Sequence, residues 1–189
     1  MKKILLKKKE GTGATGYVFL FFVMLLMVVL TLYLASVAKL MTHQHHVDDA
    51  LADSVLASLV ADDVYYFETY ESTGTPVIRF MDTDESRKIF ADCMMDDIAQ
   101  TDGFYYNFGI DTYICYEVEG EQIKITEYAG NAGNKTVMVK PGGSVTAPTG
   151  EPVTKTSAYA RVRFDIKSII DGSFMTKTKD IYCTLKVNH

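Results

Sequence analysis

The chain has 189 residues, enough for one domain of ordinary size and one appendage but too few for a second large domain. Residues 1–10 hold five of the 19 basic residues and one of the 24 acidic residues, so the rest of the chain has a net charge of −9. Nucleic-acid binding depends largely on Lys and Arg side chains that neutralise phosphates. This acidic balance therefore excludes DNA and RNA from the expected partners.

An uncharged apolar segment follows the basic N-terminus. No charged residue occurs from residue 11 to residue 38, and residues 17–38 are nearly all apolar. A helix of these 22 residues is about 33 Å long, enough to cross a hydrocarbon core of about 30 Å. We therefore predict a single transmembrane helix at residues 17–38. The basic leader, residues 1–16, should stay in the cytoplasm, which places residues 39–189 outside the cell.

A cleavable signal peptide is the alternative interpretation of the apolar segment. Ser36, Val37 and Ala38 are small residues of the kind that signal peptidase accepts, and the lysines before them form a basic flank. However, the apolar run exceeds the usual length of about 7 to 15 residues, and no Pro or Gly interrupts it. These two features favour a retained anchor.

The helical pattern continues through residues 39–71, where an apolar stripe recurs at intervals of four or seven residues. The stripe consists of Leu40, Val47, Leu51, Val55 and Leu59. Aspartates alternate with it, as expected for a helix that is half buried on its own domain. One unbroken helix is predicted from residue 17 to residue 71, where a segment with Gly74 and Pro76 ends it.

A short strand at residues 77–81 and a second helix at residues 82–100 are predicted next. Asp82 and Glu85 have the spacing of a capping box at the start of that helix. The remainder, residues 103–189, is predicted to be mainly β.

Five strands and two loops are predicted in this β region. Residues 112–118 and 122–128 flank a turn at Gly120 and should form a hairpin. Residues 157–166 alternate strongly, with one face expected in the core and the other in water. The core face consists of Ala158, Ala160, Val162, Phe164 and Ile166, and the outer face of Ser157, Tyr159, Arg161, Arg163 and Asp165.

The last strand, residues 181–187, should pair antiparallel with this segment across the turn at residues 171–173. A short strand at residues 136–140 lies between surface loops at residues 131–134 and 141–152, which are rich in Gly, Pro, Ser and Thr. The predicted fold class is therefore α+β, with a long N-terminal helix and one short helix packed on a small antiparallel sheet.

Two clusters of polar residues are candidates for a metal site. His43, His45 and His46 lie beside Asp48 and Asp49, and His45 is one helical turn from Asp49. Nothing else in the sequence completes a set of three or more ligands, so a polar collar at the membrane surface is favoured. Three aspartates on the second helix lack the spacing of a calcium-binding loop and are expected to be solvated. They are Asp92, Asp96 and Asp97.

The sequence predicts no catalytic, cofactor-binding or metal-binding residues, and a protein that is not an enzyme. The chain contains none of the usual nucleophile, zinc-protease or phosphate-loop motifs. Cys93, Cys115 and Cys183 allow at most one disulfide, and buried thiols are favoured, although the sequence does not tell whether any two of them pair.

Two groups of aromatic residues follow the two predicted helices. They are Tyr65, Tyr66, Phe67 and Tyr70, and then Phe104, Tyr105, Tyr106 and Phe108. Tyrosine-rich surfaces are common at protein interfaces, but packing in the core is the favoured interpretation for most of these residues.

The order of these segments resembles that of type IV pilin-like proteins. A basic leader is followed by the small residues 11–16, an apolar helix with an amphipathic extension, and a modest sheet. The chain looks most like the TadE-type pseudopilins of tight-adherence pilus systems, and the segment at residues 159–164 adds to this likeness. The resemblance implies a structural or assembly subunit without a cofactor. Its partners would be the lipid bilayer, other pilin-like subunits and the pilus assembly machinery.

One feature departs from that family. Pilins usually carry a glutamate five residues after the leader-peptidase cut, whereas cuts after the glycines of residues 11–16 would place Gly16, Val18 or Phe21 there. A membrane-anchored extracellular binding or sensing module, for which the acidic and loop-bearing domain is sufficient, is the alternative function.

Overall fold

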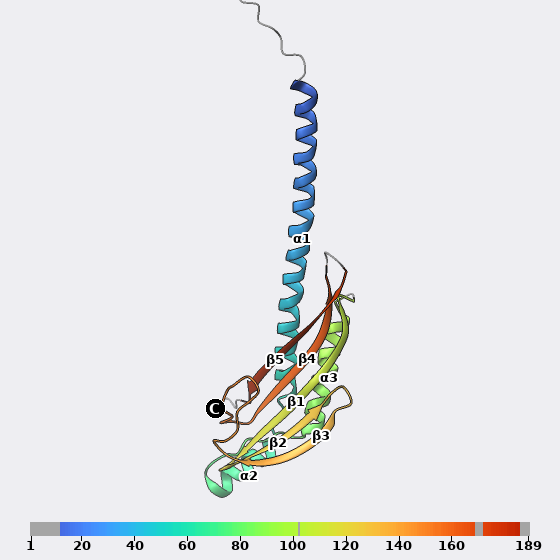
Figure 1. Cartoon of the computed structure of the whole chain (residues 1–189). Coiled ribbons are helices and arrows are strands. Elements are labelled where there is room, and N and C mark those ends of the chain that lie inside the picture. The colour runs from blue at the N-terminus through green and yellow to red at the C-terminus, as the bar shows by residue number, and fades with distance from the viewer. Residues whose placement is uncertain (1–11, 102, 169–171, 186–189) are drawn as a thin grey trace, which may run out of the picture. The chain divides into compact units, whose positions relative to one another are not determined.

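A computed structural model describes residues 12–101, 103–168 and 172–185 of the chain (Figure 1). Most of the predicted leader lies outside these residues. The chain divides into two compact units, Met1–Thr42 and His43–His189, which are described separately. Three helices precede five strands: α1 (Thr12–Ser58), α2 (Asp63–Thr73), α3 (Thr83–Ala99), β1 (Tyr105–Glu119), β2 (Gln122–Ala129), β3 (Asn134–Pro141), β4 (Ser157–Lys167) and β5 (Phe174–Thr184).

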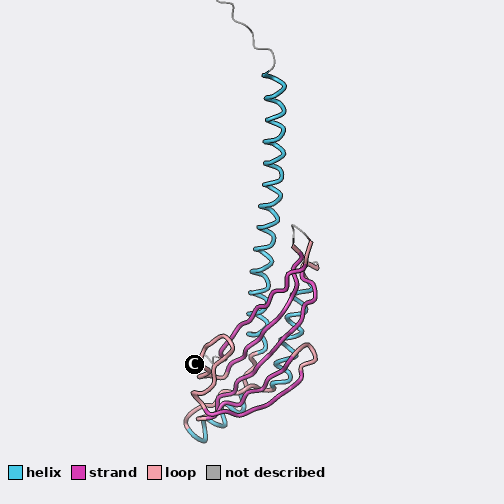
Figure 2. Tube along the Cα trace, in the orientation of Figure 1, coloured by secondary structure: helices cyan, strands magenta, loops and turns pink. Residues whose placement is uncertain are grey.

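The five strands form one antiparallel sheet in the order β3-β2-β1-β4-β5 (Figure 1). Figure 2 shows them as adjacent magenta segments. The long strand β1 is central and pairs with β2 on one side and β4 on the other. The predicted α+β fold class and both predicted hairpins are confirmed. At the β1–β2 turn Gly120 has a φ of 60°, a left-handed conformation that favours glycine. The predicted turn at residues 171–173 lies partly outside the described residues. The predicted end of the last strand, Val187, lies wholly outside them.

One face of the sheet packs on α3 and on the part of α1 that belongs to the second unit. The ring of Phe90 in α3 stacks on Tyr113 in β1, with centroids 5.0 Å apart. The hydroxyl groups of Ser58 in α1 and Tyr113 lie 2.7 Å apart. The five β4 residues predicted to face the core are at most 2% exposed, as expected from their alternation. Three members of the α1 stripe are buried as well: Val47, Leu51 and Val55.

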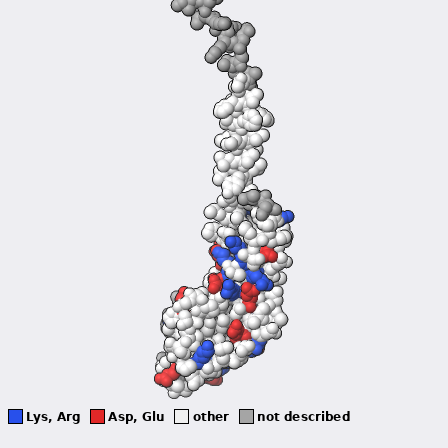
Figure 3. All heavy atoms as spheres, in the orientation of Figure 1, with Lys and Arg blue, Asp and Glu red and all other residues white. Residues whose placement is uncertain are grey.

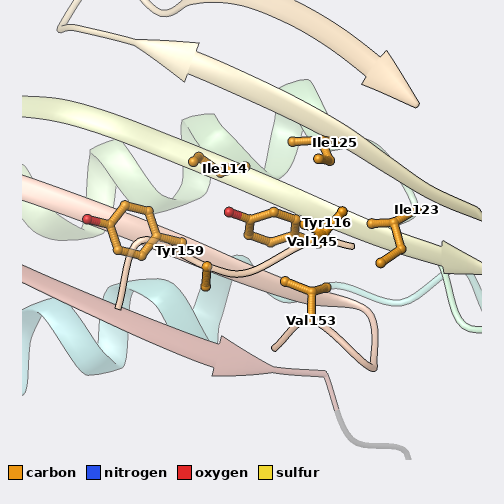
Figure 4. Packing of buried hydrophobic residues seen from close by; sticks show 8 residues of the cluster. Ile114, Tyr116, Ile123, Ile125, Val145, Val153 and Tyr159 are labelled. Carbon is orange, nitrogen blue, oxygen red and sulfur yellow. The ribbon is translucent and has the colours of Figure 1, made fainter. Parts of the chain in front are cut away.

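The opposite face of the sheet carries a second cluster of buried residues, which corrects the expectation of a wholly polar outer face on β4. Ser157 and Tyr159 are buried, whereas Arg161 and Arg163 are exposed as predicted. The segment between β3 and β4, predicted to be a surface loop, folds over part of this opposite face of the sheet (Figure 4). The cluster contains Ile114, Tyr116, Ile123, Ile125, Val145, Ala147, Val153 and Tyr159.

The loop over this second cluster is held in shape by its own backbone. The amide of Val153 donates to the carbonyl of Val145 at 3.1 Å, and the amide of Ala147 donates to the carbonyl of Glu151 at 2.8 Å. These bonds satisfy backbone groups next to the buried side chains, which would otherwise be costly to remove from water. The loop can therefore bury Val145 and Val153 although its composition is that of a surface loop.

The predicted unbroken helix from residue 17 to residue 71 is wrong. Helix α1 ends at Ser58, and α2 begins at Asp63. The segment between them is extended and forms an isolated bridge, Ala61 with Phe80, in which the amide of Met81 donates to the carbonyl of Val60 at 3.0 Å. Pairing with a segment distant in the sequence thus replaces one turn of helix.

The start of α2 is stabilised by Asp62. Its side chain accepts a hydrogen bond from the amide of Tyr65 at 3.1 Å, in the manner of an N-cap. It also accepts two bonds from the Arg79 guanidinium, at 2.8 and 3.1 Å. The guanidinium in turn lies 3.6 Å from the ring centroid of Tyr65. The aspartate therefore links the break in the helix to the segment that pairs with it.

The predicted strand at residues 77–81 is also wrong, because only Phe80 makes a bridge there. Side chains hold the segment instead. The amide of Phe80 donates to Glu117 at 3.2 Å, the hydroxyl of Thr156 donates to the carbonyl of Ile78, and the amide of Val77 donates to Thr69 at 3.0 Å. Helix α3 follows within one residue of its predicted bounds, capped by Asp82.

Replacing Ser58 with alanine should lower the free energy of unfolding by about 1–3 kcal/mol, because the buried Tyr113 hydroxyl would lose its partner. Chemical unfolding of the full chain in detergent, followed by near-UV circular dichroism of the tyrosines, measures this change. The control is Ser72→Ala, which removes an exposed hydroxyl and should change stability by less than about 0.5 kcal/mol. Equal effects of the two substitutions would contradict the assigned role of Ser58.

Candidate functional site

The most prominent candidate feature is the apolar part of α1. The described residues include one helix long and apolar enough to cross a membrane, within Thr15–Ser58 near the N-terminus. All side chains from residue 15 to residue 35 are exposed. Contiguous apolar surface of this size is rare on proteins surrounded by water and indicates contact with lipid or protein. The fold is thus compatible with a single-pass membrane anchor.

The polar side chains within this segment are satisfied by the helix itself. The hydroxyl of Thr31 donates to the carbonyl of Met27 at 2.8 Å, and that of Ser36 donates to the carbonyl of Leu32 at 2.9 Å. Such bonds remove the cost of placing hydroxyl groups in hydrocarbon, where water is not available. On the face shown in Figure 3, charged side chains gather on the second unit and not on this segment.

The histidine cluster does not form a metal site among the described residues, which contain no group of three or more His, Cys, Asp and Glu able to hold a metal ion. Instead, the ring of His43 stacks on Phe104 with centroids 3.9 Å apart, and its carbonyl accepts a hydrogen bond from the hydroxyl of Tyr105. Burial raises the pKa of Tyr105 to about 12, so this hydroxyl keeps its proton near neutral pH. His45 and Asp49 are exposed.

The acidic cluster on α3 faces solvent. Asp92 and Asp96 are exposed, and Asp97 is half-buried. This placement agrees with the predicted solvated helix face.

The three cysteines are free thiols. Cys115 and Cys183 both pair with Ala158, from opposite sides of β4, so they lie two strands apart. That spacing is about 10 Å, beyond the reach of a disulfide. Burial raises the pKa of both thiols, which disfavours the reactive thiolate. The structure therefore agrees with the interpretation of these residues as buried thiols, although Cys93 and Cys183 are only half-buried.

A cluster of charged and polar groups at the start of α3 was not anticipated from the sequence. Asp84 accepts hydrogen bonds from Lys135 at 2.7 Å and from the Tyr128 hydroxyl at 2.8 Å. The ammonium of Lys135 also lies 5.5 Å from the ring centroid of Tyr128. Hydrogen bonds from Lys135 and then Tyr128 hold the pKa of Asp84 below its usual value. Tyr128 in β2 and Lys135 in β3 are direct cross-strand partners, but no local pattern relates them to Asp84 in α3.

A buried carboxylate, Glu117, was also missed. It is 3% exposed, and its Oε2 atom lies 2.8 Å from the ammonium of Lys124. Its other oxygen accepts the bond from Phe80 described above. A signal was present, since Glu117 and Lys124 lie on one face of the predicted hairpin and directly opposite each other. The pair positions the segment before α3 and does not form a catalytic constellation.

A surface cavity lies beside the edge strand β5. Its volume is about 440 Å³, and it is lined by Leu56, Leu59, Cys183, Thr184 and Leu185. Three of the five lining residues are leucines, and the one titratable side chain among them is the Cys183 thiol, whose raised pKa does not favour nucleophilic chemistry.

No protein-family model, curated protein or solved structure matches the chain. The class of this protein is therefore given by its fold alone. It is an α+β protein whose described residues include one candidate membrane-spanning helix near the N-terminus.

The second unit should lose stability as the pH falls below the ordinary aspartate pKa of 3.8. The pKa of Asp62 is lowered by the Tyr65 amide and Arg79, that of Asp84 by Lys135, and that of Asp165 by Asn107. A lowered pKa in the folded state means that the unfolded state binds more protons in this range. The stabilisation is therefore complete above about pH 4 and is lost on acidification through the folded-state pKa.

Melting temperatures measured between about pH 2 and pH 7 test this expectation. Asp84→Asn should lower the melting temperature near neutral pH and weaken its dependence on pH. The control Asp92→Asn, at an exposed position of the same helix, should leave the profile unchanged. A wild-type profile that rises on acidification below pH 4 would contradict the assignment.

Alkylation should distinguish the cysteines. In the native protein Cys115, which is 0% exposed, should stay unmodified, while the half-buried Cys93 and Cys183 react slowly. In denaturant without reductant all three should react, because none is in a disulfide. Peptide mass mapping gives the sites directly. Native labelling of Cys115, or a pair of thiols that needs reductant, would show that the assignment is wrong.

Proposed function

We propose that this protein is a membrane-anchored structural or assembly subunit of a pilus or secretion system, similar to TadE-type pseudopilins. The observation that carries the proposal is that one continuous helix, α1, bears an exposed apolar segment and also contributes Val47, Leu51 and Val55 to the core of the folded unit. Anchor and domain are therefore parts of one element, as the pilin-like resemblance implies.

The charge distribution supports an orientation with the N-terminus in the cytoplasm and the domain outside the cell. Five lysines lie in residues 1–10, and the remainder of the chain is acidic. Positive flanks are retained on the cytoplasmic side, whereas acidic residues have little influence on orientation. The bilayer is then the first partner of the segment at residues 17–38.

The same segment is the proposed assembly element. An apolar helix can leave the bilayer only by burying its surface elsewhere, and the apolar helices of neighbouring subunits in a filament offer such a surface. The missing glutamate after any of the possible leader-peptidase cuts favours an assembly or minor-subunit role over that of the major subunit.

A single-pass membrane-anchored binding or sensing module is the second candidate. The aliphatic cavity beside β5 favours it, because its volume of about 440 Å³ lies within the usual range for small ligands. Thermal-shift screening of the detergent-solubilised chain with apolar ligands tests this function. A ligand that binds only the folded state must raise the melting temperature. Loss of that shift in Leu185→Ser would assign it to the cavity.

Partnership with an assembly machine is tested by cross-linking in native membranes followed by purification of the tagged protein. Recovery of a secretion ATPase, an inner-membrane platform protein or other small pilin-like chains is expected. A protein that is strictly monomeric, and that is encoded away from such genes, would contradict the pilin-like proposal while leaving the anchor intact.

The anchor predicts that the native protein stays in the membrane after an alkaline carbonate wash and is released only by detergent. About 22 apolar residues, each contributing a few tenths of a kcal/mol, outweigh the cost of the lysine flank. Intact-mass measurement gives the mature N-terminus. A retained anchor starts at Met1 or Lys2, and a pilin-type cut leaves Thr12, Ala14 or Tyr17. A soluble protein that starts at Lys39 would instead establish a cleaved signal peptide and overturn the proposal.

A further inference from the structure

Three exposed apolar side chains lie at one end of the sheet, two in contact on one face and the third on the other face, and we name this end the sheet-end patch. They are Tyr106 in β1 and Phe174 and Met175 in β5, with exposed fractions of 42%, 55% and 43%. The rings of Tyr106 and Phe174 meet edge to face, with centroids 5.1 Å apart. The start of β5 is exposed on both faces, since residues 174–178 are all exposed. An exposed apolar edge strand of this kind is a liability unless something covers it.

The favoured interpretation, that most residues of the two aromatic groups pack in the core, is wrong. Among the eight, Tyr105 alone is buried, and Phe67, Tyr70 and Tyr106 are exposed. Tyr105 is buried, but its neighbour Tyr106 is exposed, because successive residues of a strand point to opposite faces.

The sheet-end patch lies at the end of the domain where the chain enters it. Phe104 and Tyr105 contact His43, the first residue of the folded unit. Tyr105 pairs with Ile166 in β4, and Ile166 pairs with Met175 in β5. A continuous series of contacts thus connects His43 to the patch.

Covalent geometry limits the distance between this end of the domain and a bilayer that holds residues 17–38. His43 is five residues after residue 38, and even a fully extended chain of that length spans at most about 18 Å. This limit holds at any angle between the helix and the domain. The headgroup region is roughly 5–8 Å thick on each side of the hydrocarbon core. The short connection keeps His43 close to the bilayer surface, and the patch lies at the same end of the domain as His43.

The chemistry of the patch matches that environment. Aromatic rings with polar groups favour the membrane interface, and long basic side chains extend from there to the phosphates. Lys167 pairs directly with Phe174, and both Lys167 and Lys177 are exposed. The nearby carboxylate of Asp165 accepts hydrogen bonds from Asn107 at 2.7 Å and Thr176 at 2.6 Å, so its acceptor atoms are satisfied within the domain while its negative charge remains.

We propose that the sheet-end patch docks onto the headgroup region of an anionic bilayer, with Phe174, Met175 and Tyr106 at the interface and Lys167 beside the phosphates. This docking rests on the proposed membrane anchor and adds a second point of contact to it. With two contacts, the domain is held against the membrane surface and cannot rotate freely about the short connection.

Single tryptophan substitutions test the proposal, because the chain contains no tryptophan of its own. The full-length protein is placed in vesicles of phosphatidylcholine and phosphatidylglycerol that contain either a headgroup nitroxide lipid or a lipid brominated in mid-chain. Phe174→Trp and Tyr106→Trp report on the patch, and Phe22→Trp reports on the anchor. Phe67→Trp in α2 is the matched control, since Phe67 is a similarly exposed aromatic residue, at 62%.

The control position is far from the patch. Helix α2 is linked through Asp62 and Arg79 to the segment that contacts Glu117. Glu117 lies eleven residues along β1 from Tyr106, a distance of about 35 Å.

The headgroup nitroxide should quench the fluorescence of Phe174→Trp and Tyr106→Trp at least threefold more strongly than that of Phe67→Trp, and the brominated lipid should quench Phe22→Trp. Equal nitroxide quenching of the three domain variants, with Phe22→Trp still quenched by the brominated lipid, would overturn the docking but leave the anchor standing. If the brominated lipid does not quench Phe22→Trp, the anchor itself is wrong and the docking with it. Nitroxide quenching of Phe67→Trp alone would place a different face of the domain on the membrane.

Discussion

A contact between two buried hydroxyl groups joins the main parts of the domain. Tyr113 lies in the central strand, is 0% exposed, and meets the last residue of α1, Ser58, at 2.7 Å. Its ring stacks on Phe90 of α3, so a single side chain contacts both helices that cover this face. Burial raises the pKa of Tyr113, which keeps the phenol neutral and able to donate. The cost of leaving such a group without a partner favours the position of Ser58 beside Tyr113.

The two parts of helix α1 have different roles. The part of α1 from Val47 onwards is determined by packing against the sheet, and the ion pair between Asp48 and Lys179, at 2.8 Å, adds a polar contact at its side. The part before residue 36 has no buried side chain among those described and is suited to lipid or to other subunits. A proposed role in assembly uses both properties, because the folded unit stays attached to whichever partner covers the apolar segment.

Sequence periodicity was sufficient to predict buried residues where the spacing of side chains along a strand decides which of them face the core. The alternation in β4 identified its five core residues because a strand places every second side chain on the same face. The same reasoning failed for Ser157 and Tyr159, whose burial depends on Val145 and Val153 arriving from a loop. It also failed at residues 59–62, because neither Pro nor Gly marks the break, and only pairing with residues 79–81 makes it favourable. At the candidate sites, the separation of Cys115 from Cys183 required the strand order.

The sequence by itself determined the apolar segment, the charge asymmetry around it, the α+β class and the two hairpins. These properties depend on composition and on local periods of about two or 3.6 residues, which neighbouring residues establish together. Tertiary structure alone decided where α1 ends, which loop covers the second face, and that Tyr106 and Phe174 come together in an exposed patch. Each of these results depends on contacts between residues far apart in the chain, and such contacts leave no regular pattern in the local sequence.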